Sequence, residues 1–251
     1  EQIASSNPLS LVPGSHFLET YRLALFGGKT YSGSTIAPVA PMLWVSFVCA
    51  MVIAIGKIAI SLLSAFAIVY FRFPGRMYFF WAIFVTLMLP VEVRIVPTYA
   101  VAANALTPFQ AILDWTGISW LIATLSGVEV ALEWNLLNSY TGLILPLVAT
   151  ATGTFLYRQF FLTIPDELVE AARMDGAGPL RFLWDVLIPL SRTNIAALAT
   201  IMFVYAWNQY LWPLLVITDR ANYGMVVVQL SDLVPDQMTT GGGTPTWHYA
   251  M

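Results

Sequence analysis

Four long apolar segments constrain this chain more than any other feature of its sequence. They run from about residue 42 to 71, 77 to 97, 140 to 161 and 194 to 218. Each has the roughly 20 predominantly apolar residues that a helix needs to cross the hydrocarbon core of a bilayer. Because lipid offers the backbone no hydrogen-bonding partner, only helices satisfy such segments there. The sequence therefore predicts an all-α, polytopic membrane protein with four visible spans.

The composition excludes an ordinary soluble domain. Hydrophobic residues make up 58% of the 251 residues and charged ones only 10%, whereas about a quarter of a soluble domain is charged. The net charge of −3 leaves no basic surface for nucleic acid. The single cysteine, Cys49, rules out an internal disulfide, and the two histidines, His16 and His248, have no metal-ligand spacing. We expect no nucleic-acid partner and no metal site.

A fifth apolar segment, residues 118–132, is too short to cross a bilayer. It has roughly 15 residues against the roughly 20 required, and it contains Glu129. Three tryptophans lie in or beside it: Trp115, Trp120 and Trp134. Tryptophans are enriched at membrane–water interfaces, so the segment is predicted to lie at the interface, with a short re-entrant piece as the alternative.

Arginines place the loops on the two sides of the membrane. Six of the 11 Lys+Arg residues fall in two short loops: Arg72, Arg76, Arg158, Arg173, Arg181 and Arg192. The positive-inside rule assigns those loops to the cytoplasm. We therefore predict one transmembrane domain over residues 1–251 with the following parts: an outer segment 1–40, two spans in 41–101, an outer insertion 102–138, two spans in 139–218 with a cytoplasmic loop 163–190, and an outer loop 219–251.

Both ends of the chain lie on the outer side in this topology. The first 30 residues contain no basic start followed by an apolar core, so no targeting signal is visible. The aromatic residues in 246–251 stand where an interfacial cluster would open another helix. We expect one further span at each end that this chain does not include.

The loop from 162 to 191 is too polar to span and too patterned for a linker. Thr163 followed by Asp166 predicts a capping box at the start of a helix, and Gly176 is the type of residue that ends one in a left-handed conformation. A second short helix is predicted from Gly178-Pro179 to Pro189. The pattern indicates two short helices with a sharp bend, and an amphipathic connector on the inner leaflet is the plain alternative.

The spacing within this loop resembles a family signature. Glu170-Ala171-Ala172, then Gly176 after three residues, then Val186-Leu187-Ile188-Pro189 after nine more resemble the EAA motif of binding-protein-dependent ABC importer permeases. Val186 and Ile188 are mild departures from that motif. The resemblance implies a type I ABC importer permease fold, usually of six helices, in which this loop docks on an ATP-hydrolysing subunit. The coupling residues it implies are Glu170, Ala171, Ala172, Asp175, Gly176 and Pro189.

The resemblance extends over the chain apart from residues 106–136, with matching stretches at 64–74, 87–94, 155–173 and 207–213. The stretch 89–94 (LPVEVR) implies an importer of sn-glycerol 3-phosphate or related glycerophosphodiesters, with a neutral sugar or polyol as the alternative cargo. A rival class, a membrane enzyme or a scaffold, would require a cluster of catalytic carboxylates or histidines, and the sequence has none.

The resemblance also implies the partners. These are a second permease subunit forming a heterodimer, two ATP-binding subunits, a soluble substrate-binding protein and the lipid of a bacterial inner membrane. No GxxxxGK[ST] motif occurs in the chain. We therefore expect no enzymatic activity and no cofactor here, with ATP and Mg²⁺ held by the partner ATPase.

Polar residues within the spans are candidates for the substrate path, because such residues are costly in a membrane and usually face its interior. Asn208 and Gln209 lie beside Trp207, Tyr210 and Trp212 in the fourth segment. Amides and aromatic rings suit a polyol, and hydrogen bonding between helices is the equal alternative.

Three charges lie within the first two segments. Arg94 and Glu92 are also candidates for the substrate path. Arg94 matches a phosphate group, and an ion pair of Arg94 with Glu92 or with a neighbouring subunit is the alternative. For Lys57, far from the end of its segment, we expect a buried pairing role or an outward-snorkelling side chain rather than substrate contact.

Overall fold

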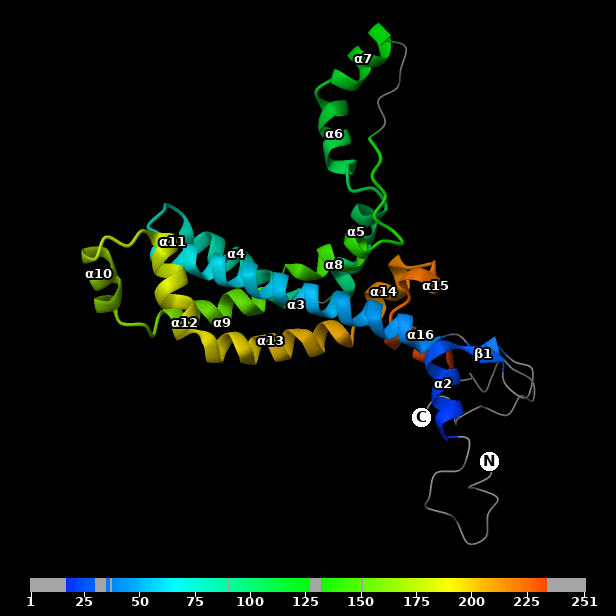
Figure 1. Cartoon of the computed structure of the whole chain (residues 1–251). Coiled ribbons are helices and arrows are strands. Elements are labelled where there is room, and N and C mark those ends of the chain that lie inside the picture. The colour runs from blue at the N-terminus through cyan, green and yellow to red at the C-terminus, as the bar shows by residue number, and fades with distance from the viewer. Residues whose placement is uncertain are drawn as a thin grey trace. The chain divides into compact units, whose positions relative to one another are not determined.

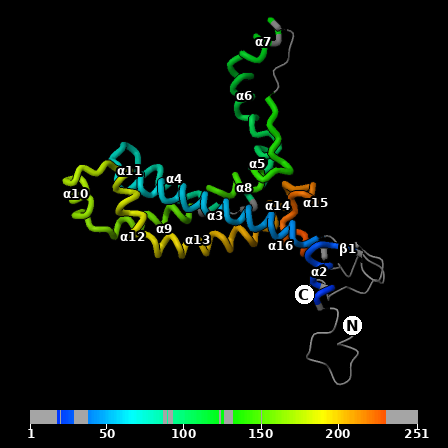
Figure 2. Tube along the Cα trace, in the orientation of Figure 1, coloured from blue at the N-terminus to red at the C-terminus, as the bar shows by residue number. Residues whose placement is uncertain are grey.

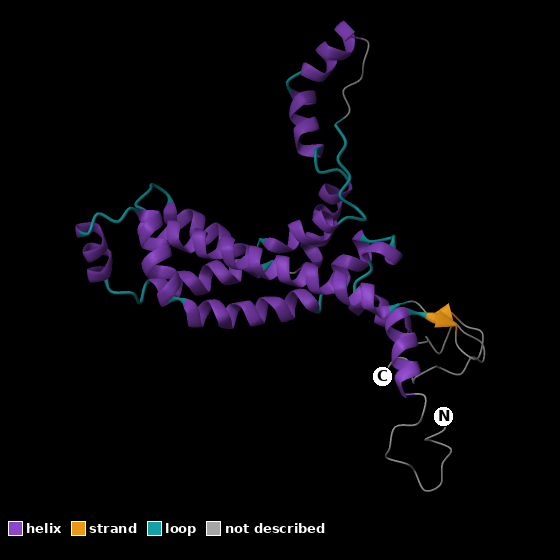
Figure 3. Cartoon of the chain, in the orientation of Figure 1, coloured by secondary structure: helices purple, strands orange, loops and turns teal. Residues whose placement is uncertain are grey.

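The computed structural model describes residues 17–29, 35–36, 38–89, 91–126, 132–149 and 151–233. Within this part of the chain the structure is helical, apart from one antiparallel pair of two-residue strands, β1 (Gly28–Lys29) and β2 (Thr35–Ile36) (Figure 3). The all-α fold class predicted from the apolar segments is confirmed.

The chain divides into two compact units, residues 1–48 with 219–251, and residues 49–218. The first unit contains α2 (Phe17–Phe26), both strands, α15 (Arg220–Tyr223) and α16 (Val226–Leu233). Helix α3 (Val39–Tyr70) contributes residues 39–48 to this unit. There the buried hydroxyl of Ser46 accepts a hydrogen bond of 2.8 Å from the backbone N–H of Val226, which joins α3 to the start of α16.

Helix α3 is the longest element, with 32 residues and thus a length of about 48 Å. Its sequence has a single charge, Lys57, and its only proline, Pro41, lies in the first turn, where proline is tolerated. Among the described residues, α3 alone is long and apolar enough to cross a membrane. The number rises to three if each of two bent helix pairs is taken as one interrupted span.

The second, third and fourth predicted spans are interrupted. They appear as α4 (Arg76–Met88) with α5 (Val91–Ala103), α8 (Tyr140–Val148) with α9 (Ala151–Phe161), and α13 (Arg192–Trp207) with α14 (Leu211–Val216). The first break has a local cause, because the residue before a proline disfavours helical geometry. Leu89, which precedes Pro90, is extended, with φ −79° and ψ 121°. The structure thus differs from the continuous segments that hydropathy predicts.

Residues 102–138 contain α6 (Thr107–Trp115) and α7 (Ile118–Ser126). The returning chain is tied to this pair, because the Gln110 side-chain oxygen accepts from the N–H of Leu132 at 3.0 Å and the Asn104 oxygen accepts from the N–H of Trp134 at 3.2 Å. With nine residues, α7 is too short to cross a bilayer, in line with the sequence. Its placement at the interface stays a prediction.

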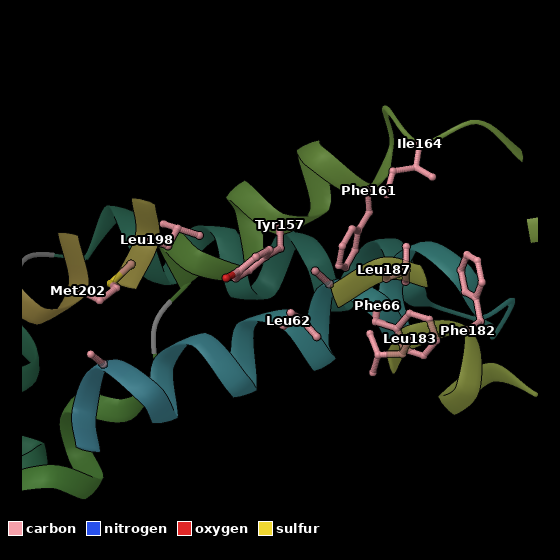
Figure 4. Packing of buried hydrophobic residues seen from close by; sticks show 12 residues of the cluster. Leu62, Phe66, Tyr157, Phe161, Ile164, Phe182, Leu183, Leu187, Leu198 and Met202 are labelled. Atoms are coloured by element: carbon pink, nitrogen blue, oxygen red, sulfur yellow. The ribbon is translucent and has the colours of Figure 1, made fainter. Parts of the chain in front are cut away.

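The core of the second unit joins α3, α9 and α13 to a short helical run made of α11 (Pro179–Phe182), the π-helix η1 (Leu183–Leu187) and α12 (Ile188–Leu190). The Cα trace shows α9 and α13 running alongside α3 (Figure 2). Phe66, Phe182 and Leu183 gather at one end of this core, and Leu198 and Met202 lie at the other (Figure 4).

Candidate functional site

The loop singled out by the sequence forms an elbow of two short helical pieces. Its first piece is α10 (Asp166–Met174), which has no buried residue. Figure 1 shows α10 connected to α9 by one loop and to α11 by another. The capping-box prediction is wrong: Pro165 is the N-cap, and the hydroxyl of Thr163 donates to the carbonyl of Phe160 at 2.7 Å. The acidic first turn instead complements the helix dipole through Asp166 and Glu167.

The end of α10 follows the sequence prediction. Gly176 has φ +72°, in the left-handed region. Its N–H donates to the carbonyl of Arg173 at 3.0 Å, and the N–H of Ala177 donates to that of Ala172 at 2.9 Å. These two bonds form a Schellman motif, with Asp175 as the C-cap. A Cβ added at Gly176 would meet nothing within 4 Å, so backbone conformation, not space, requires glycine there.

The second piece of the elbow is anchored in the core. Phe182, Leu183 and Leu187 are at most 5% exposed. The ring of Phe182 meets Tyr70, at the end of α3, edge to face with centroids 5.4 Å apart. Tyr70 also contacts Phe161 of α9, at 5.9 Å. One aromatic cluster therefore ties the elbow to the ends of two bundle helices.

A bend of 76° follows the elbow, between residues 179–190 and α13. Pro189 explains the irregular backbone before it, because a proline cannot donate to the carbonyl four residues earlier and its ring crowds that carbonyl. This irregular backbone is the π-helix Leu183–Leu187, directly before α12. At the bend itself, both the N–H and the hydroxyl of buried Ser191 donate to the carbonyl of Leu187, at 2.9 and 2.5 Å.

Most of the expected coupling residues lie on the outer surface of the elbow. Glu170, Ala171, Asp175 and Gly176 are exposed, whereas Ala172 is partly buried against the core. The sixth, Pro189, lies apart from them in α12. Apolar side chains accompany the exposed residues on this surface: Leu168, Met174, Leu180 and Trp184, which are 41% to 83% exposed. The elbow thus presents a mixed polar and apolar face while its inner side packs on the bundle.

A cavity of about 770 Å³ lies within the second unit. Its walls come from α3, α4, α5, α8, α9, α13 and α14. Each of the three interrupted spans contributes a residue from its break: Leu89, Ala149 and Gln209. Helix breaks at membrane depth are tolerated where they line a cavity, and the three breaks here share one.

The structure brings three of the predicted path residues to this cavity: Arg94, Gln209 and Trp212. Trp207, Asn208 and Tyr210 are not among the lining residues described. Trp207 instead packs on Phe203, with ring centroids 5.8 Å apart, and Tyr210 is the exposed N-cap of α14. The side chain of Glu92 lies outside the described residues, so its ion pair with Arg94 stays a prediction.

The amides of Asn208 and Gln209 cap the end of α13. Asn208 donates to the carbonyl of Val204 at 3.0 Å, and Gln209 donates to that of Tyr205 at 3.2 Å. Both bonds run back to the residue's own helix rather than across to another helix. The amide oxygen of Gln209 is an acceptor at the cavity wall.

Trp212 supplies a hydrogen-bond donor that α8 lacks. Pro146 lies inside α8 and has no N–H for the carbonyl of Gly142, four residues earlier. The indole N–H of Trp212, which is 4% exposed, donates to that carbonyl at 3.1 Å. Nearby, Asn138 and Thr218 exchange hydrogen bonds, with the Thr218 N–H donating at 2.7 Å. These contacts fix α14 against α8 beside the cavity.

Two residues that line the cavity were not among the predicted path residues. Lys57 is only 4% exposed, and its ammonium group lies 4.1 Å from the centroid of the Tyr205 ring; both residues line the cavity. The side chain is buried, as one alternative foresaw, and does not reach outward. The signal in the sequence was that Lys57 is the single charge in the first apolar segment. Tyr205 had no signal that distinguished it from the other aromatic residues.

Comparison with known proteins identifies the class. The family model described as binding-protein-dependent transport system inner membrane component matches residues 57–242, and the chain belongs to this family. It is therefore an inner-membrane permease component of a transport system, which confirms the class predicted from the EAA spacing. Membership in a family of transport permeases accords with the expectation that the chain is not an enzyme.

The individual relatives are sn-glycerol-3-phosphate transport system permease proteins, named UgpE. The protein of Brucella abortus (strain 2308) is 51% identical over 245 residues, covering 97% of this chain and 74% of the relative. That of Escherichia coli (strain K12) is 48% identical over 251 residues, covering 100% and 76%. Our expectation that residues 106–136 depart from the resemblance stays a prediction.

A solved structure shares the fold. It is the crystal structure of a bacterial ABC transporter involved in the import of the acidic polysaccharide alginate, with a TM-score of 0.55 and 20% identity, covering 88% of this chain and 74% of that one. The likeness supports the predicted ABC importer permease fold.

Proposed function

We propose that this chain is the transmembrane permease subunit of an ATP-driven importer of sn-glycerol 3-phosphate or related glycerophosphodiesters. The observation that carries the proposal is the identity of about half of all residues, over 97% of the chain, with permeases of the sn-glycerol-3-phosphate transport system. A neutral sugar or polyol is the alternative cargo. The two cations at the cavity, Lys57 and Arg94, favour the anionic substrate.

The proposed assembly places the chain in a bacterial inner membrane as a multi-pass protein. It pairs with a second permease subunit, two ATP-binding subunits bind on the cytoplasmic side, and a soluble binding protein delivers substrate from outside. ATP and Mg²⁺ are bound by the ATPase subunits. Family membership supports this arrangement, and it follows that this chain supplies the path and the coupling surface.

The coupling surface in this proposal is the exposed face of the elbow, with Glu170, Ala171 and Ala172 on α10. Movement of an ATPase bound there would reach the bundle through Phe182, because that ring packs on Tyr70 at the end of α3. A closely packed core shifts between discrete arrangements rather than deforming smoothly. The elbow can therefore convert closure of the ATPases into a change in the tilt of α3, α9 and α13.

The substrate path in this proposal is the 770 Å³ cavity. Arg94 is placed to bind the phosphate group, because its planar guanidinium matches phosphate oxygens. Gln209 offers an amide oxygen to hydroxyl groups. Trp212 shapes the wall, since its N–H is already used by Gly142.

The assembly and cargo are tested together. A tag on this chain should co-purify an ATPase subunit from cells that express the complete system. Proteoliposomes containing that complex, ATP and the binding protein should accumulate radiolabelled sn-glycerol 3-phosphate, and should not accumulate glycerol or maltose. Purification without an ATPase, or uptake of a neutral sugar only, would contradict the proposal.

Coupling is tested with two glycines of the elbow. Gly176 and Gly178 both have open space around an added Cβ, but only Gly176 has a positive φ, +72°, whereas Gly178 has −68°. Alanine in the left-handed region costs roughly 1–2 kcal/mol. Gly176→Ala should therefore lower transport per ATP hydrolysed, Gly176→Pro should abolish transport, and the matched control Gly178→Ala should change neither. Equal effects of the two alanines, or transport by Gly176→Pro, would refute the docking role.

A further inference from the structure

We propose that Lys57 selects the phosphorylated substrate in the transport path, by binding the phosphate group inside the cavity together with Arg94. This inference rests on the proposed function and deepens it. The sequence left a phosphate contact or an ion pair open for Arg94, and for Lys57 it predicted no substrate contact.

The first observation is where Lys57 lies. It stands within α3, which has no other charged residue, and only 4% of its surface is exposed. An ionised side chain inside a membrane helix is costly, and such residues mark substrate and ion pathways.

The second observation is the absence of a counter-charge. In the described residues, no carboxylate lies within ion-pair distance of Lys57. Its contact is the face of the Tyr205 ring, 4.1 Å from the ammonium group. A cation–π contact orients the ammonium group and partly compensates its burial, but it leaves the net charge in place. Among the described side chains, Lys57 is therefore held in position without an anionic partner.

The third observation is the charge of the cavity that Lys57 faces. Of the lining residues in the described part of the chain, two are charged, Lys57 and Arg94, and both are cationic. Hydroxyl groups stand on the same walls, among them those of Ser64 and Thr154. The volume, about 770 Å³, is within the usual range for small-molecule sites.

These features fit a small phosphate monoester. Its two negative charges balance the two cations, and the hydroxyl groups of the walls and the amide of Gln209 can bind its polyol part. A neutral polyol of the same size would leave a buried ammonium group without a counter-ion. Discrimination against the neutral compound thus arises from the unpaired charge it leaves behind.

The experiment measures uptake in proteoliposomes containing the complete importer, ATP and the binding protein. The variants are Lys57→Met, which keeps the length of the side chain and removes the charge, and Lys57→Arg, which keeps the charge. Arg72→Met is the control, because it removes one positive charge from an exposed loop outside the cavity. Uptake is expressed per assembled complex, with assembly measured by co-purification of the second permease and the ATPase.

We expect Lys57→Met to lower the rate of sn-glycerol 3-phosphate uptake by about tenfold or more, since loss of one member of a buried charge pair has effects of that size. Lys57→Arg should retain most of the uptake, and Arg72→Met should equal the wild type. Unchanged uptake in Lys57→Met overturns the inference while the proposed function stands. Failure of Lys57→Met to assemble with the second permease also overturns it, because Lys57 would then bind that subunit.

The identity of the substrate is tested by the wild-type importer in the same uptake experiment. If the wild-type importer accumulates a different anionic compound, the proposed cargo is wrong, and loss of that uptake in Lys57→Met still supports the role of Lys57. If the wild-type importer accumulates only neutral sugars, both the cargo and the inference are overturned.

Discussion

The hydrogen bond from Trp212 of α14 to Gly142 of α8 allows the free energy that it contributes to unfolding to be predicted. The carbonyl of Gly142 has no backbone donor within α8, because Pro146 has no N–H. Its partner is the indole N–H of Trp212, at 3.1 Å. Trp212→Phe keeps an aromatic ring and removes the donor. Leaving a buried carbonyl unpaired costs about 1–3 kcal/mol, and measured hydrogen bonds between membrane helices reach about 1.7 kcal/mol. We expect the lost bond to contribute about 1–2 kcal/mol.

Pro146→Ala offers a way to isolate this contribution. The alanine N–H can donate to Gly142 within α8, so the carbonyl no longer depends on Trp212. In that background Trp212→Phe should lose only the packing of the larger ring. Because the packing loss is common to both backgrounds, it cancels in a double-mutant cycle, and the coupling free energy should be about 1–2 kcal/mol.

The assay is unfolding of the purified chain in mixed micelles with increasing SDS, followed by far-ultraviolet circular dichroism, which does not depend on tryptophan fluorescence. The wild type, both single variants and the double variant are compared. If Trp212→Phe costs the same free energy in the wild-type background and in the Pro146→Ala background, the two positions are independent. That result would refute the role of the Trp212 indole as the donor that replaces the missing N–H of Pro146.

Three further substitutions test other contacts. Gly142→Ala should prevent stable folding, because its Cβ would collide with the backbone carbonyl oxygen of Leu136; insertion with normal protease resistance would contradict the packing. Tyr157→Phe should leave the unfolding midpoint unchanged or raise it, because the buried hydroxyl has no partner among the described residues and an unpaired buried hydroxyl is unfavourable. Asn138→Gly keeps the left-handed φ of 53° but loses the bonds to Thr218, and should lower the free energy of unfolding by about 1 kcal/mol; an unchanged value would show that those bonds contribute nothing.

The parts of the structure that depend on local chemistry were predictable from the sequence. Gly176 ends α10 in the left-handed region because only glycine takes that conformation without strain. The long apolar segment without internal proline became α3. The same local reasoning failed at Thr163, because Pro165, which fixes its own φ, took the N-cap position instead.

The parts that depend on distant contacts were not predictable. At the break after Trp207, Pro213 has no N–H for the carbonyl of Gln209, but hydropathy alone continued the span to residue 218. The bond from Trp212 to Gly142 joins residues 70 positions apart, and no sequence spacing reports it. Lys57 was visible as an unusual charge, but only the fold shows that it faces Tyr205 and the cavity.

The three helix breaks that share the cavity have a consequence for water. Backbone groups beside Leu89, Ala149 and Gln209 lack part of their helical hydrogen bonding and line the same space. Such groups must be hydrated when no cargo is present. A hydrated chamber lowers the dehydration penalty for a polar solute that enters it. On the proposed substrate path, the interrupted helices would therefore let the solute exchange its water molecules for backbone groups inside the hydrocarbon layer.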